Sequence, residues 1–333
     1  MTDHLKGTGG ESARFDVVGI GNALVDVIAH ATDSFIEEFG LTKGWMDLID
    51  TDRALELYEA LGNSVEMSGG SAANTMCGVA SFGGSAAYIG KVSDDELGRA
   101  FDHDLHAVGV RFSGSRHTEV PTGRCIVVVT PDAERTMNTY LGASSLLTPA
   151  DLDEDTVALG KVLYMEGYLF DRDDAKAAFR RAAQVAHEAG RMVSLTLSDS
   201  FCVDRHRRDF RDLVSDEVDL LFGNEAELTA LYETETFDEA VAELRRHCEF
   251  AAITVGAKGS ILITGDDLIE VPAMPVPRVL DTTGAGDLYA AGFLHGLTSG
   301  APLARCGELG SIAASEVISH VGPRPLVELR TLV

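Results

Sequence analysis

The sequence predicts an α/β protein with three layers, α/β/α, in which helices cover both faces of a mostly parallel sheet and a small β-rich lid stands beside it. Two observations lead to this fold class. Apolar strand-like runs alternate with amphipathic helical stretches, which is typical of βαβ units. One region instead shows the alternating pattern of antiparallel strands. The strand-like runs are residues 15–20, 86–92, 162–165, 192–197, 218–222 and 251–255.

The antiparallel region lies between residues 110 and 140, where GRCIVVVT and ERTMNTY flank a Pro131-Asp132 turn. Together with residues near 22–50 it is expected to form the lid. We therefore predict one domain over residues 15–333, of which the lid is a discontinuous part. Residues 1–14 are polar and Gly-rich, and we expect them to be disordered.

Composition excludes several classes of partner. The chain has 333 residues, with 27 Lys and Arg against 53 Asp and Glu, and its formal net charge is −26. Such a surface repels phosphate backbones and anionic lipids, so neither nucleic acid nor a membrane is an expected partner. No apolar run reaches the roughly 18 residues of a membrane span. The five cysteines are far apart in sequence, and reduced thiols in a cytoplasmic protein are expected.

The segment DTTGAGDLYAAGFLHGL, which begins at Asp281, is a Gly-rich turn that runs into an apolar helix. Gly284, Ala285 and Gly286 are small enough for the backbone to approach a phosphoryl group, which the helix dipole would favour. Asp287 then lies in the first turn, where its carboxylate could accept the proton of an attacking alcohol. The alternative is that Asp287 only complements the helix dipole.

A second Gly-rich segment, SGGSAANTMCGVASFGG over residues 68–84, has a Gly-Gly pair that opens a helix. Gly69 and Gly70 permit close approach to a substrate, next to Ser71, and Asn74 offers a donor and an acceptor to hydroxyl groups. The alternative is a Gly-capped helix that only packs.

These two motifs resemble the signatures of the ribokinase-like (pfkB) family of carbohydrate and purine kinases. The resemblance covers about residues 15–330 and is closest to the adenosine kinase branch, through GNALVD, TLSDSF, VDLLFGNEAE and GSIAASEVISHVG. It implies a ribokinase-like fold and an ATP-dependent kinase with an alcohol acceptor, in which Asp287 is the catalytic base.

The resemblance also implies substrate contacts. Asp26 in GNALVD resembles the family's acid that grips substrate hydroxyls, with a weaker indication for Asn22, whereas the alternative for Asp26 is a turn cap. Glu166 stands where sugar-kinase relatives carry an acid that contacts sugar hydroxyls. Tyr168 in EGYLF is similar to the aromatic residue that packs on the purine, and a core tyrosine is its alternative.

For the nucleotide and its metal, Asn224 and Glu227 in NEAE match the family's NxxE motif. Asn224 is expected near the nucleotide, and Glu227 near Mg²⁺ through water. The alternative is that Asn224 caps a helix. Thr254, Gly256 and Gly259 in TVGAKG resemble the segment that holds the nucleotide phosphates and ribose, or form a plain connection between strands. No GxxxxGK[ST] loop occurs, which excludes Walker-type phosphate binding.

Positive charge must be supplied locally in so acidic a chain, and Arg135 on the lid is the candidate, with a salt bridge of the lid as the alternative. The resemblance further implies a binding site for a monovalent cation such as K⁺. This site would begin at Asp281 and Thr283, and Gly322 would close its loop.

The substrate remains open between two classes at this level. Adenosine or another nucleoside, phosphorylated on the 5′-hydroxyl, is the first prediction, and a ribose-like or keto sugar is the alternative that Glu166 favours. The alternative to a kinase is a non-catalytic sensor of nucleoside or sugar. ATP with Mg²⁺ and a small-molecule substrate are the expected ligands of a monomer or homodimer.

Overall fold

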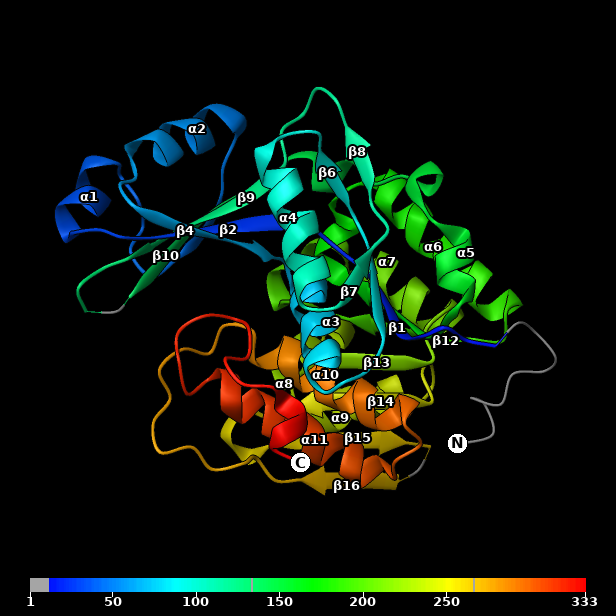
Figure 1. Cartoon of the computed structure of the whole chain (residues 1–333). Coiled ribbons are helices and arrows are strands. Elements are labelled where there is room, and N and C mark those ends of the chain that lie inside the picture. Colours follow the sequence, from blue (N-terminus) through cyan, green and yellow to red (C-terminus); the bar gives the residue numbers. More distant parts are fainter. Residues whose placement is uncertain (1–11, 133, 266) are drawn as a thin grey trace.

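The large sheet dominates the computed structural model, which describes residues 12–132, 134–265 and 267–333 (Figure 1). Within these ranges the strand order of this sheet is β16-β15-β14-β13-β12-β11-β1-β5-β7. The run from β14 to β7 is parallel, and β15 and β16 are antiparallel at one edge. The strands are β1 (Phe15–Ile20), β5 (Ala86–Ile89), β7 (Val110–Phe112), β11 (Gly160–Glu166), β12 (Met192–Thr196), β13 (Leu220–Asn224), β14 (Phe250–Thr254), β15 (Ser260–Thr264) and β16 (Asp267–Val271).

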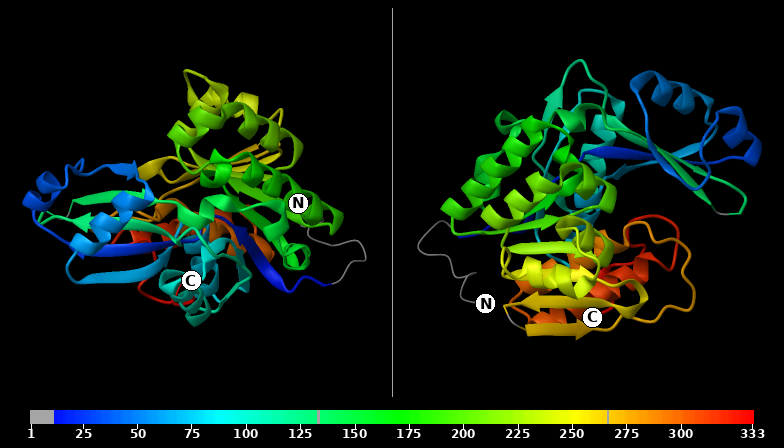
Figure 2. Two further views of the ribbon diagram at one scale, coloured as in Figure 1. Left: turned by 90° about the horizontal axis from the view of Figure 1, so that it is seen from above. Right: turned by 180° about the vertical axis from the view of Figure 1, so that it is seen from behind.

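Helices pack on both faces of this sheet, as the two views of Figure 2 show. Alternation along each strand explains the two layers, since Leu220 and Phe222 join one apolar core and Leu221 joins the other. The first core includes α3 (Ser71–Ser81), α4 (Glu96–Ala107), α10 (Ala285–Thr298) and α11 (Leu303–Val317). The second includes α5 (Glu154–Ala158), α6 (Asp173–Glu188), α7 (Ser200–Asp216), α8 (Glu225–Tyr232) and α9 (Phe237–Leu244).

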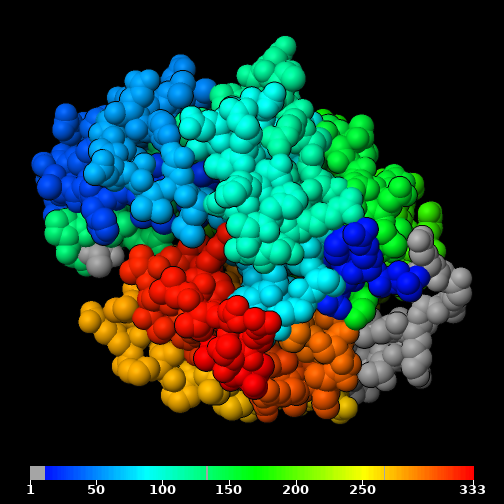
Figure 3. Space-filling model, viewed as in Figure 1, coloured from blue at the N-terminus to red at the C-terminus, as the bar shows by residue number. Residues whose placement is uncertain are grey.

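A second sheet, with the order β3-β10-β9-β2-β4, stands out from the body (Figure 3). Its strands are β2 (Leu24–His30), β3 (Met46–Leu48), β4 (Ser64–Gly69), β9 (Gly123–Val129) and β10 (Arg135–Tyr140). One face carries Val25, Val27, Ile126 and Val128, which pack with the helices α1 (Asp33–Glu38) and α2 (Thr51–Ala60). We call this sheet the lid sheet.

The predicted three-layer α/β fold is confirmed, and the antiparallel pairing of β9 with β10 agrees with the expected hairpin. The run at residues 86–92 divides at Gly90 into β5 and β6 (Lys91–Ser93), and β6 pairs with β8 (Ser115–His117) in a small separate sheet. Of the expected lid range, β7 lies in the large sheet, and the lid sheet also takes in β4. The disorder expected for residues 1–14 lies mostly outside the described residues; Arg14 donates its N–H to the Leu159 carbonyl at 2.8 Å.

Chain order places a topological switch point at β1, which pairs with β5 on one side and β11 on the other. Crevices at the carboxyl ends of strands next to such a point are where open α/β sheets bind ligands. Asn22 follows β1, Glu166 ends β11, Asn224 ends β13 and Thr254 ends β14. The tertiary fold therefore brings these sequence candidates to one edge of the sheet.

Candidate active site

Asp287 lies in the first turn of α10, directly after the Gly-rich turn. Gly284 is the N-cap residue and has φ +79°, a left-handed conformation that favours glycine. A Cβ there would also come within 2.7 Å of the Pro323 backbone. The N–H groups at the start of a helix have no intrahelical acceptor, so that of Gly286 can face an anion, whereas the Ala285 N–H donates to the Thr282 carbonyl at 3.2 Å.

The Asp287 carboxylate is held by two donors from α3. Ser71 Oγ donates to Oδ1 at 2.6 Å, and Asn74 Nδ2 donates to Oδ2 at 3.1 Å. Burial raises the pKa of Asp287, while these two hydrogen bonds and the charge of Arg324 oppose the rise. The two Gly-rich motifs, more than 200 residues apart in sequence, thus meet at one carboxylate.

Asp26 faces the same site from the lid strand β2. Its carboxylate has no hydrogen-bond donor within the described part of the chain, and a Cβ on Gly69 would lie 2.5 Å from its oxygens. Burial raises the pKa of Asp26 to about 6, with Arg324 and Arg135 lowering it and Asp287 raising it. Gly70, at φ +94°, leaves room for the Asn22 carbonyl, which a Cβ would approach to 2.2 Å. The Gly-Gly pair therefore makes room for Asp26 and for the turn after β1.

Glu166 lies beneath this turn and is 1% exposed. Its carboxylate accepts hydrogen bonds from Asn22 Nδ2 at 3.0 Å and from the Ala72 N–H at 2.7 Å. Asn22 Oδ1 in turn accepts from Ser144 Oγ at 3.0 Å. Burial raises the pKa of Glu166 to about 7, although these hydrogen bonds lower it. Asn22 and Glu166 are therefore bonded to the chain itself, beside the site.

Arg135 connects the lid strand β10 to the Gly-rich turn. Its guanidinium donates to Asp281 Oδ2 and, at 3.4 Å, to Thr283 Oγ1. Asp281 also accepts from the N–H and hydroxyl of Thr283 and from the Gly322 N–H. Burial alone would raise the pKa of Asp281, but the Gly322 and Thr283 hydrogen bonds and the Arg135 charge lower it. With its oxygens engaged by donors and an arginine, this carboxylate does not fit a cation ligand in this arrangement.

Asn224 and Glu227 form a reciprocal capping box at the start of α8. The Glu227 N–H donates to Asn224 Oδ1 at 2.9 Å, and the Asn224 N–H donates to Glu227 Oε2 at 3.1 Å. Burial raises the pKa of Glu227 to about 7. The described residues contain no group of three His, Cys, Asp or Glu side chains that could hold a metal ion. A lone carboxylate still fits a divalent ion that keeps its waters and is bound mainly through substrate phosphates.

The TVGAKG segment lies beyond β14, on the same edge of the sheet. Thr254 ends the strand, and its hydroxyl donates to the Gly223 carbonyl at 3.4 Å. A Cβ on Gly256 (φ +59°) would meet nothing within 4 Å. At Gly259 (φ +106°) a Cβ would lie 2.0 Å from the Val271 carbonyl. Close packing explains Gly259, whereas the left-handed φ alone favours glycine at Gly256.

Tyr168 follows β11 and packs partly against the second core. Its hydroxyl donates to the Ser198 carbonyl at 3.3 Å, and its N–H donates to Ser198 Oγ at 3.2 Å. These contacts correspond to the core-tyrosine alternative and leave only part of the side chain exposed.

Two residues near the site were not singled out from the sequence. Arg324 donates from Nε to Asn74 Oδ1 at 3.2 Å, and Ser144 bonds Asn22. The signal for Arg324 was its place two residues after Gly322, in a tail already associated with the Gly-rich turn. Ser144 lies in ASSL, which carries no motif, so only the fold reveals it.

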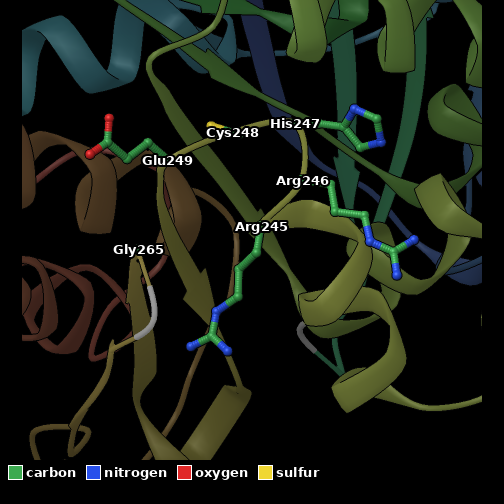
Figure 4. Close-up of a pocket in the computed structure, with 6 residues that line it drawn as sticks. All are labelled: Arg245, Arg246, His247, Cys248, Glu249 and Gly265. Atoms are coloured by element: carbon green, nitrogen blue, oxygen red, sulfur yellow. The ribbon is translucent and has the colours of Figure 1, made fainter.

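A shallow pocket of about 370 Å³ lies elsewhere, lined by Arg245, Arg246, His247, Cys248, Glu249 and Gly265 (Figure 4). Glu249 directly precedes β14, so this pocket is at the amino edge of the parallel strands. The candidate residues lie at the opposite, carboxyl edge of these strands or on the lid sheet, and the pocket is no part of their site.

Comparison with known proteins decides the family. Residues 34–329 match the family described as pfkB family carbohydrate kinase. The chain belongs to the pfkB family. Among solved structures it is similar to adenosine kinase from Sinorhizobium meliloti, with 53% identity and a TM-score of 0.88, over 96% of this chain and 98% of that one. A probable sugar kinase protein from Rhizobium etli CFN 42 is 47% identical over the same shares, also with a TM-score of 0.88.

A curated relative gives the same relationship at greater distance. Adenosine kinase of Saccharomyces cerevisiae is 26% identical over 329 residues, which cover 92% of this chain and 96% of the relative. As a pfkB kinase the chain is an ATP-dependent phosphotransferase, and this prediction from the sequence is confirmed. The family implies ATP with a divalent metal ion. None of the helices in the described ranges has the length and hydropathy needed to cross a bilayer.

Proposed function

We propose that this pfkB kinase is an adenosine kinase, which transfers the γ-phosphoryl group of ATP to the 5′-hydroxyl of adenosine. The observation that carries the chemistry is the position of Asp287, in the first turn of α10 with both oxygens bonded by α3. The similarity to the Sinorhizobium meliloti adenosine kinase supports the substrate.

Asp287 is the general base of the proposed reaction. As the 5′-oxygen attacks the γ-phosphorus, the hydroxyl proton passes to an Asp287 oxygen and the bond from phosphorus to the bridging oxygen of ADP breaks. The turn formed by Gly284, Ala285 and Gly286 and the dipole of α10 stabilise the charge on the transferred group. Ser71 and Asn74 hold the Asp287 carboxylate in one orientation, so no conformational entropy is lost in orienting it during the reaction.

Asp26 binds the ribose diol in this proposal. A half-buried carboxylate without a donor costs free energy, and two hydroxyl groups would satisfy it with charge-assisted hydrogen bonds. The strand pairing puts Ile28, Cys125, Val127 and Met137 on the same face of the lid sheet as Asp26. That face combines a carboxylate for the sugar with an apolar surface for the purine, and a contact of Tyr168 with the purine stays a prediction.

The nucleotide is proposed to bind along the carboxyl edge of the sheet. Asn224, Thr254, Gly256 and Gly259 would line its phosphates and ribose, and Arg135 would supply positive charge from the lid. Bound Mg²⁺ would neutralise the β- and γ-phosphate oxygens, with Glu227 near its water ligands. A monovalent cation such as K⁺ beside Asp281 and Thr283 stays a prediction, and the engagement of Asp281 with Arg135 does not favour it. Cytoplasmic location and a monomer or homodimer likewise stay predictions.

Phosphorylation of a free sugar is the second candidate, because the Rhizobium etli protein at 47% identity is called a probable sugar kinase. The residue that favoured a sugar was Glu166. Its two oxygens accept three hydrogen bonds from Asn22 and Ala72, and the side chain is buried, which leaves little capacity for sugar hydroxyls. This supports a nucleoside over a free sugar.

The deciding experiment compares kcat/KM with MgATP for adenosine, inosine, ribose, fructose and ketodeoxygluconate. Adenosine should be preferred, because a free sugar forgoes the base contacts, which contribute on the order of 1 kcal/mol beyond buried area. Preference for a free sugar would overturn the nucleoside assignment. Turnover of none of them would instead favour a sensor of nucleoside or sugar.

A further inference from the structure

Three successive residues of the C-terminal segment contact the active site. The Gly322 N–H donates to Asp281 Oδ2 at 2.9 Å. Pro323 occupies the space that a Cβ on Gly284 would need. Arg324 reaches α3, where Nε donates to Asn74 Oδ1 at 3.2 Å. In Figure 1 this segment, coloured red, lies beneath the lid sheet. The segment is therefore docked on the Gly-rich turn and delivers one arginine to the centre of the site.

Arg324 acts on Asp287 through the Asn74 amide. The amide oxygen accepts from Arg324, and the amide NH₂ group donates to Asp287 Oδ2. An amide has one accepting and one donating end, so a cation on one side and a carboxylate on the other fix its orientation. The Nη2 atom of Arg324 is buried without a hydrogen-bond partner in the described residues, and the guanidinium thus keeps a further donor within the site.

The site also holds two negative charges, which the positive charge of Arg324 partly compensates. Asp26 and Asp287 are two carboxylates close enough that the charge of one raises the pKa of the other. Arg324 is the cation that lowers the pKa of both. Arg135 also lowers the pKa of Asp26, but its guanidinium is bonded to Asp281. Like charges in a partly buried site destabilise each other unless a cation lies nearby.

We propose that Arg324 is a positioning residue of the kinase site, which orients the Asn74 amide toward Asp287 and supplies the positive charge that Asp26 and Asp287 require together. The role rests on the proposed function, because it is defined relative to Asp287 as the base. It makes the C-terminal segment a part of the active site.

Other ionisable groups surround the two carboxylates and are unchanged in the test. The groups that interact electrostatically with Asp287 are Asp26, Glu166, Tyr164 and Tyr168. The groups that interact electrostatically with Asp26 are Arg135, Cys125 and Asp287.

The test uses Arg324→Gln, Arg324→Lys and the wild type, with kcat and KM measured from pH 5 to pH 9. Arg324→Gln should lower kcat/KM about tenfold at pH 7.5, mainly through kcat, because the Asn74 amide that bonds Asp287 is no longer held in one orientation. Its acid limb should move upward by about one pH unit, because loss of the cation raises the pKa of both carboxylates. Arg324→Lys keeps the charge, so its acid limb should stay at the wild-type position while kcat falls. Arg330→Gln, an exposed change in the same tail, is the control and should match the wild type.

A second measurement needs no substrate. Carboxyl ¹³C NMR titration of the wild type and Arg324→Gln, assigned with Asp26→Asn and Asp287→Asn, should give higher midpoints for both carboxyl groups in the variant. If the wild type phosphorylates none of the substrates, the proposed function fails and this titration still decides on Arg324. If Arg324→Gln does not fold, Arg324→Lys is compared with the wild type instead. A lower kcat with the acid limb at the wild-type position then supports the proposal, and an unchanged kcat contradicts it. An acid limb and titration midpoints that are both unchanged in Arg324→Gln would overturn the proposal.

Discussion

Glu166 Oε1 lies 3.2 Å from the backbone nitrogen and 3.0 Å from the side-chain nitrogen of Asn22, so one oxygen accepts both donors of one residue. The other oxygen accepts the Ala72 N–H, in the first turn of α3. Glu166 therefore joins the end of β11, the turn after β1 and the helix that carries Ser71 and Asn74. These contacts fix the position of the helix whose side chains hold Asp287, the proposed general base.

The first prediction concerns the stability that Glu166 contributes. Its pKa is raised from 4.5 to about 7 by burial, so the folded protein binds this proton more tightly than the unfolded chain. Stability from this group is therefore full below pH 4.5 and is lost as the pH rises toward about 7. Glu166→Gln removes this dependence. The gap in unfolding free energy between wild type and variant should narrow by about 2 kcal/mol from pH 5.5 to pH 8, measured by urea unfolding.

Glu270→Gln is the control for this measurement, because Glu270 is exposed on the edge strand β16. Its gap to the wild type should be the same at both pH values. A gap for Glu166→Gln that is equally constant would contradict the burial argument.

The second prediction concerns the base. Asp287→Asn should lower kcat by roughly 10²- to 10⁴-fold, because an amide accepts no proton from the attacking hydroxyl. Affinity for ATP, measured by calorimetry, should change little. Ser71→Ala removes only one of the two bonds that orient the carboxylate, and its loss should be about tenfold. A kcat close to the wild-type value in Asp287→Asn would rule out its role as base.

The third prediction separates the two roles of Glu227. Gln is also accepted at this position of a capping box, so Glu227→Gln should keep α8 capped while it removes the charge. If Glu227 helps to hold the hydrated Mg²⁺, the concentration for half-maximal rate should rise several-fold. Glu225→Gln, a change at an exposed residue two positions before Glu227, is the matched control. An unchanged Mg²⁺ titration in Glu227→Gln would leave the cap as its sole role.

The fourth prediction concerns room for Asp26. In Gly69→Ala the new Cβ would lie 2.5 Å from the Asp26 carboxylate and displace it. KM for the nucleoside should rise roughly 10- to 100-fold, from loss of charge-assisted hydrogen bonds, while KM for ATP stays near the wild-type value. Gly62→Ala serves as control, because a Cβ there meets nothing within 4 Å. Equal effects on both substrates would argue for a general folding defect instead.

Local signals in the chain were sufficient for the fold class and the kinase family, and they led to the proposal of Asp287 as the base. Strand and helix periodicities depend on neighbours in sequence, and a Gly-rich turn before an apolar helix is a continuous motif, so residues 281–297 could be interpreted alone. The same locality explains why NEAE was ambiguous, since a capping box and a metal motif use the same two side chains.

Contacts across long sequence separations were decided only by the tertiary structure. Glu166 could be matched to a sugar ligand by position, but its partners Asn22 and Ala72 come from the turn after β1 and from α3, and their distances depend on how the sheet and helix pack. Arg324 carries no motif, and only docking of the tail against Gly284 and Asp281 brings it to Asn74. A side chain's role depends on which donors and acceptors the fold leaves unpaired, and that pairing exists only once the distant segments have met.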